Sequence, residues 1–121
     1  MSKKILSRDD ILNINDIEIR EVYIPEWKGS VLVKALSGAE RDAFEESLLV
    51  GKGPNKELNM NNVRAKLVAL SVVDKKGNRI FSDSDVKELS RKSATALQRI
   101  FAVAQKLSGL TEADIEELSK N

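Results

Sequence analysis

An acidic segment near the middle of the chain has residue types that could bind a metal ion. The twelve residues from Asp74 to Asp85 have the length of a calcium-binding loop and lie between two segments with helical patterns. Such a loop needs an oxygen ligand at its third position, where this chain has Lys76, and a bidentate glutamate at its end, where it has Asp85. Two neighbouring lysines would also repel a divalent cation. We therefore interpret the segment as a turn followed by a capped helix, with no metal.

Other segments suggest phosphate binding or acid/base catalysis but lack the required partners. The run Gly51–Lys52–Gly53–Pro54 is glycine-rich and basic, yet it lacks the preceding strand, the following helix and the Lys-Ser/Thr pair of a phosphate loop. The glutamate pairs at 45–46 and 116–117 are adjacent in sequence, so in a helix their carboxylates point apart. With no histidine and no cysteine, the chain also has no thiol nucleophile and no imidazole base. The sequence predicts a non-enzymatic binding protein without cofactor or metal.

Composition predicts one soluble domain. The chain has 121 residues, 41% hydrophobic and 32% charged, which is enough to bury a core but too short for two ordinary domains. Its 20 basic and 19 acidic residues give a net charge of +1, which offers no bulk attraction to nucleic acid or to a membrane surface. No apolar run is long enough to span a membrane, and the first residues do not form a signal peptide. We expect a cytoplasmic protein.

The N-terminal third predicts a short helix and a β-hairpin. Ser7 followed by Asp10 resembles a capping box, which predicts one or two helical turns. Alternating apolar residues predict a strand over Ile17–Ile24, with a slip at Arg20–Glu21 that suggests a bulge. The segment Pro25–Ser30 predicts a turn in which glycine takes the positive φ, and Val31–Leu36 predicts the returning strand. Residues 7–36 thus form the first part of the single domain.

The remaining residues, 37–121, predict a helical part interrupted by one flexible loop near 51–58. Each helix begins at a polar capping residue and carries apolar residues at helical spacing. The fold class we predict is α+β, with the hairpin packed against about four to five short helices and helix predominating. The expected helices begin at Ser37, at Asn59 or Asn61 (running to Val73), at Ser82, at Ser93 (ending before Gly109) and at Thr111.

Trp27 admits two interpretations. An indole at a hairpin turn is either a lid on the core or an exposed anchor for a partner. The exposed alternative groups Trp27 with Tyr23, Val31 and Val33 as a partner-binding strip beside a free strand edge. In the other interpretation these residues pack inward on the helices.

Four stretches together resemble the small tail assembly chaperones of long-tailed bacteriophages and prophages. Their order and spacing carry the resemblance, which extends over nearly the whole chain. The stretches are Pro25–Val33, Leu36–Glu45, Arg64–Asp74 and Gly77–Val86.

The resemblance implies a non-enzymatic role in the host bacterial cytoplasm. Family members coat the tape measure protein, keep it soluble, help to recruit tail tube protein and are absent from the finished virion. Many relatives also exist as a longer frameshifted product whose extension contacts the tube protein. A useful coat needs many weak contacts from repeated copies, so we expect a homo-oligomer.

Two other functions remain open from the sequence. One is a structural tail or head-to-tail connector component that stays in the virion. The other is a small nucleic-acid-binding regulator that uses the segment from Gly51 to Lys66, in which basic residues outnumber acidic ones.

Overall fold

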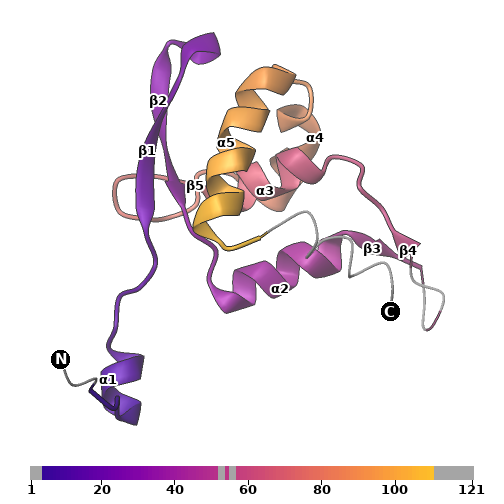
Figure 1. Ribbon diagram of the computed structural model, residues 1–121. Helices are drawn as coiled ribbons and strands as arrows, with labels where there is room; N and C mark the ends of the chain where they lie inside the picture. Colours follow the sequence, from indigo (N-terminus) through magenta and orange to yellow (C-terminus); the bar gives the residue numbers. More distant parts are fainter. Residues whose placement is uncertain (1–3, 52–53, 55–56, 111–121) are drawn as a thin grey trace.

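The computed structural model describes residues 4–51, 54 and 57–110, and has the predicted α+β fold. In Figure 1 a twisted antiparallel hairpin stands beside a group of helices, and a short N-terminal helix lies apart from both. The helices are α1 (Arg8–Leu12), η1 (Pro25–Trp27), α2 (Gly38–Ser47), α3 (Val63–Ser71), η3 (Asp83–Asp85), α4 (Val86–Leu89) and α5 (Ala94–Leu107). The strands are β1 (Ile19–Ile24), β2 (Gly29–Lys34), β3 (Leu49–Val50), β4 (Glu57–Leu58) and β5 (Val72–Val73).

The main sheet has the order β1-β2-β5, with β2 in the centre and every pairing antiparallel. The β1–β2 register runs without a break from Ile19 opposite Lys34 to Ile24 opposite Gly29. The predicted bulge at Arg20–Glu21 is therefore wrong. A bulge would place two residues opposite one, whereas Arg20 and Glu21 each have their own partner on β2.

In the hairpin turn the positive φ belongs to Lys28, so the prediction that a glycine takes it is wrong. Residues Pro25–Trp27 form the 3-10 turn η1, helped by a proline whose φ suits a first helical position. The next residue, Lys28, has φ 52° and closes the turn with its N–H donating to the carbonyl of Pro25. Because Lys28 already reverses the chain, Gly29 is the first residue of β2.

Strand β5 was not predicted, because its two residues continue the helical spacing of apolar residues in α3. The second predicted helix was expected to reach Val73, but α3 ends at Ser71 and the backbone becomes extended at Val72. Val72 and Val73 pair with Val33 and Leu32 of the central strand. Two β-branched residues gain more by completing a sheet than by extending a helix, in which their χ1 freedom is restricted.

The capping residues set most helix starts as predicted. The side chains of Ser7 and Ser37 each accept from the backbone N–H three residues later and complete reciprocal capping boxes. Ser93 accepts from the N–H of Ala96 at the start of α5, and the capping box of Ser82 begins η3. Helix α3 differs: its N-cap is Asn62, at φ 58°, rather than Asn59 or Asn61.

A second, two-stranded sheet occupies part of the predicted loop. Leu49 pairs with Leu58 and Val50 with Glu57, so residues 57–58 form a strand instead of loop. The rest of the expected loop includes residues 52–53 and 55–56, which lie outside the described residues, as does the predicted last helix from Thr111.

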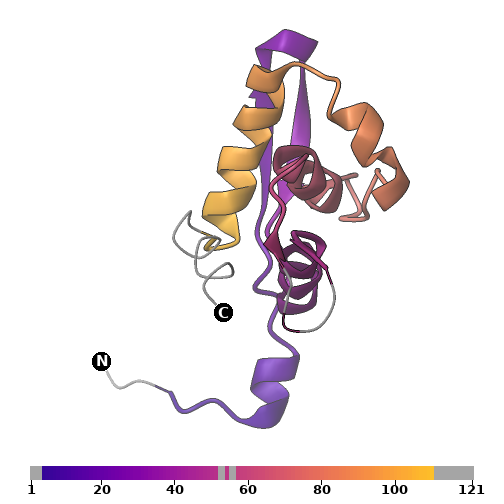
Figure 2. The same cartoon turned by 90° about the vertical axis from the view of Figure 1, so that its right-hand side faces the viewer.

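Helix α3 forms the centre of the core. Its buried side chains, including Leu67 and Val68, contact the cluster that also contains Phe44 of α2 and Ile100 of α5. As Figures 1 and 2 show, α5 runs alongside the hairpin and packs on β1, β2 and η1. The N–H of Leu36 also donates to the hydroxyl of Ser108, 2.9 Å away, which fastens the end of the hairpin to the end of α5.

Candidate partner-binding surface

The sheet divides three of the four predicted binding residues between its two faces, and the fourth, Trp27, lies in the turn η1. Residues directly opposite each other in the register share a face, and successive residues alternate. Val31 and Val33 therefore lie on the face toward the core, where Val33 is 0% exposed and Val31 is partly buried against the core cluster. Tyr23 lies on the other face and is 60% exposed. The four residues do not form one strip.

Ile19 belongs with Tyr23 on the outer side of the hairpin. Ile19, Glu21 and Tyr23 alternate along β1 on what we call the outer face, and Ile19 is 43% exposed. Ile19 is not one of the four residues predicted from the sequence to bind a partner. Extending the period-2 alternation two residues back from Glu21 would have found it.

The outer face is bounded by the turn that follows β5. A Cβ built on Gly77, whose φ is +84°, would lie 3.6 Å from the Cδ1 of Ile19. This turn therefore reaches the beginning of β1, and Val73 beneath it is buried. Tyr23, farther along the strand, stays open.

Strand β1 also has a free edge within the part of the chain that the structure describes. Its only strand partner there is β2, so the backbone groups on the opposite side can pair with an added strand. The edge carries Arg20 and Glu21, whose charges discourage indiscriminate pairing. The edge is six residues long.

Trp27 lies at the end of the hairpin, where an ion pair holds the turn on α5. The guanidinium of Arg99 donates to both carboxylate oxygens of Glu26, over 2.9 and 3.1 Å. This bidentate contact with Arg99 is the main cause that lowers the pKa of Glu26 below its ordinary value. Trp27 itself keeps 37% of its surface exposed, so it is partly covered and partly open to a partner.

The acidic segment that resembled a calcium loop uses its carboxylates within the chain. One oxygen of Asp74 accepts from the N–H groups of Lys76 and Asn78, at 2.8 and 3.0 Å. Asp85 accepts from the N–H of Ser82 in a capping box. The described residues contain no group of three or more acidic side chains placed to hold a metal ion.

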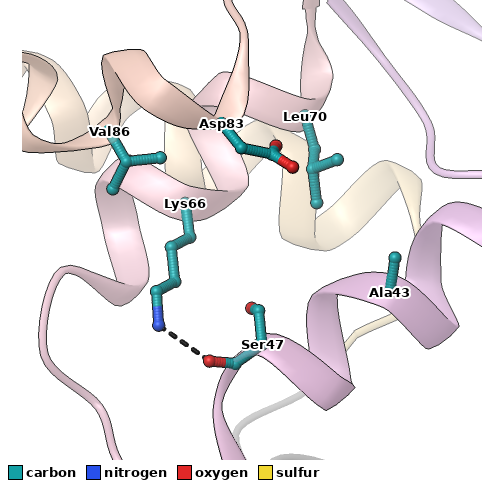
Figure 3. Close-up of a pocket in the computed structure, with 6 residues that line it drawn as sticks. All are labelled: Ala43, Ser47, Lys66, Leu70, Asp83 and Val86. Carbon is teal, nitrogen blue, oxygen red and sulfur yellow. Dashed lines mark hydrogen bonds between the residues drawn. The ribbon is translucent and has the colours of Figure 1, made fainter.

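A shallow groove of about 280 Å³ lies between α2, α3 and the segment η3–α4. Figure 3 shows Leu70, Val86 and Asp83 across the groove from Ala43 and Ser47. The ammonium of Lys66 is held by the carbonyl oxygen of Ser47, 2.8 Å away, at the end of α2. The volume is slightly below the ~300–1,000 Å³ of small-molecule sites, so the groove suits side chains better than a cofactor.

Comparison with known proteins identifies the family. The model of the phage tail assembly chaperone family matches residues 11–121. Among solved structures, the tail assembly chaperone of bacteriophage HK97 has the same fold, with a TM-score of 0.56. The two are 17% identical, and the match covers 75% of this chain and 85% of that one.

No curated protein matches the sequence. Among the described residues, no helix has the length and apolarity needed to cross a membrane. Because the family model covers all but the first ten residues, this chain belongs to the phage tail assembly chaperone family.

Proposed function

We propose that this chaperone is non-enzymatic, binds the tape measure protein during tail assembly and keeps it soluble. The observation that carries the proposal is the family match over residues 11–121. An unassembled tape measure helix exposes apolar stripes that would aggregate in water. A small protein with exposed apolar residues on a firm scaffold is suited to covering them.

Exposed residues of the hairpin are the contact points in this proposal. Tyr23 and Ile19 on the outer face and the open part of Trp27 offer apolar area, and the β1 edge offers backbone hydrogen bonds. Val31 and Val33 support this surface from beneath. Each contact is weak, and self-association of the chaperone would multiply the contacts along a long partner.

The proposal places the protein in the host cytoplasm as an assembly factor absent from the finished virion. It also assigns the recruitment of tail tube protein to the chaperone, directly or through a longer frameshifted product. Mass spectrometry of purified virions tests the first part. Recovery of this chain at a stoichiometric level would favour a structural tail component instead.

Co-expression with the tape measure protein of the same phage or prophage tests solubilisation. We expect the tape measure protein to move from the pellet to the supernatant with the wild-type chaperone and to return to the pellet with Tyr23→Lys. A matched control is Ile80→Lys, because Ile80 is similarly exposed, at 52%, but lies outside the hairpin. If the wild-type chaperone leaves the tape measure protein insoluble, the proposed function is wrong.

A further inference from the structure

The N-terminal arm, residues 4–14, has apolar side chains that are exposed in the part of the chain that the structure describes. Ile5 is 91% and Leu12 is 64% exposed, and Leu6, Ile11 and Ile14 are also exposed. Helix α1 within the arm buries none of its residues. Figures 1 and 2 both show α1 apart from the rest of the domain.

The arm nevertheless has strong local signals for order. A complete capping box joins Ser7 and Asp10, and a lowered pKa of Asp10 follows mainly from its bond to the backbone N–H of Ser7. Leu6 and Ile11 occupy the two positions of a hydrophobic staple. Helices shorter than about 12–15 residues are nonetheless marginal in water without a packing surface. A five-residue helix with these signals is suited to dock on another surface.

The groove between α2, α3 and η3–α4 complements the arm in apolarity and in charge. Its floor contains Leu70, Val86 and Ala43. On α2, Asp42 and Glu46 are spaced i, i+4 and form an exposed row beside the row of Ala43 and Ser47. Among the described residues, neither side-chain carboxylate has an ion-pair or hydrogen-bond partner, whereas the ammonium of Lys66 in the groove is held by the carbonyl of Ser47.

In the arm, Ile5 and Leu6 lie between two cations, Lys4 and Arg8. Within the described residues, the ion pairs of these cations are exposed and stay inside the arm, at 3.6 Å from Lys4 to Asp10 and 3.1 Å from Arg8 to Asp9. Such pairs contribute little and can exchange partners. The arm therefore offers aliphatic side chains flanked by positive charge, and the groove offers an aliphatic floor flanked by negative charge.

We propose that the arm of one copy docks in the groove of a second copy, with Ile5 and Leu6 on the apolar floor. Lys4 and Arg8 then face the acidic row of Asp42 and Glu46. The arm and the groove are different surfaces, so the contact is head-to-tail and can repeat along a chain of copies. The inference rests on the proposed function, because it supplies the repetition that coating a long partner requires.

Sedimentation velocity on the full chain over a range of concentrations tests the contact. Ile5→Asp removes the arm's apolar anchor, and the pair Ala43→Lys with Glu46→Lys fills the groove and reverses part of its charge. We expect each variant to raise the dissociation constant of self-association at least tenfold. Ile80→Asp, at an exposed residue outside both surfaces, should leave self-association unchanged.

Mixing the two variants gives a stricter test. The arm variant keeps an intact groove and the groove variant keeps an intact arm, so an equimolar mixture should form heterodimers that do not grow further. The proposal is wrong if wild type stays monomeric at every concentration, if Ile5→Asp associates like wild type, or if the mixture does not pair. Solubilisation of the tape measure protein by wild type is measured separately, so failure of the arm contact is distinguishable from failure of the proposed function.

Discussion

At the scale of single residues, the Glu26–Arg99 pair links the hairpin turn to the longest helix. Its two ends are 73 positions apart in sequence, so no local pattern could indicate it. The pair fixes the orientation of η1, and with it the setting of Trp27, because Glu26 immediately precedes the indole. The ion pair therefore positions the end of the hairpin.

Glu26→Gln should lower the melting temperature in a pH-dependent way. Arg99 lowers the pKa of Glu26 in the folded state, so the pair's stabilisation is complete above the ordinary value of 4.5 and is lost as pH falls through the lowered folded pKa. We expect a small deficit relative to wild type from pH 7 to about 5 that disappears in more acidic buffer. Thermal unfolding followed by circular dichroism measures it. Glu21→Gln on the same hairpin is the control, and an equal effect there would contradict the assignment.

Truncation of Val33 should lower stability and spare partner binding, whereas truncation of Tyr23 should weaken partner binding with little loss of stability. Val33→Ala removes fully buried methyl groups, and we expect a loss of about 2–3 kcal/mol in the free energy of unfolding with no direct effect on partner binding. Tyr23→Ala should cost less than about 1 kcal/mol and should weaken binding of the tape measure protein. Urea unfolding and co-sedimentation separate the two effects. Equal destabilisation by both would mean that Tyr23 is a packing residue.

Val33 was predicted as part of an exposed strip but is buried, and the difference has a physical cause. The run Val31–Leu32–Val33 is apolar at every position, so alternation alone does not distinguish the buried face from the exposed one. The assignment depends on which face of the hairpin α5 covers, and the contacts of α5 with β1 and β2 join segments far apart in the chain. The hairpin was predictable, but its buried face was not.

At the scale of elements, the capping boxes of α1 and α2 provide a matched pair. Ser37→Ala removes the N-cap of a helix that buries Phe44, and we expect it to cost about 1 kcal/mol. Ser7→Ala removes an equivalent box from α1, which buries nothing, and should leave global stability unchanged. Chemical denaturation of both variants tests this. A similar loss for Ser7→Ala would show that the arm belongs to the cooperative unit of the free chain.

Helix starts were predictable because a capping residue and the first turn are adjacent in sequence. Ser37 and Ser93 carry that information within three residues. Strand β5 was not predictable in the same way, because Val72 and Val73 continue the apolar spacing of α3. Their pairing with β2 depends on partners about 40 positions away, which a local pattern does not contain.

At the scale of the whole molecule, the fold joins a body with a packed core to an arm whose described residues are not buried. Helix α3 is packed by α2, α4 and α5, and the central strand is paired on both sides. Toward the other described residues, the arm makes only local hydrogen bonds and exposed ion pairs. These two parts should therefore open with very different free energies.

Hydrogen exchange should display this difference and its dependence on assembly. In dilute monomer, we expect amides of α3 and of the centre of β2 to exchange only through global unfolding, and amides of α1 to exchange close to unprotected rates. When the concentration is raised until copies associate, protection of α1 should increase because docking in a neighbour's groove supplies the missing packing surface. The Ile5→Asp chain is the control, and its α1 should stay unprotected at every concentration. Concentration-independent protection of α1 in wild type would contradict docking between copies and would mean that the arm is stabilised within a single chain.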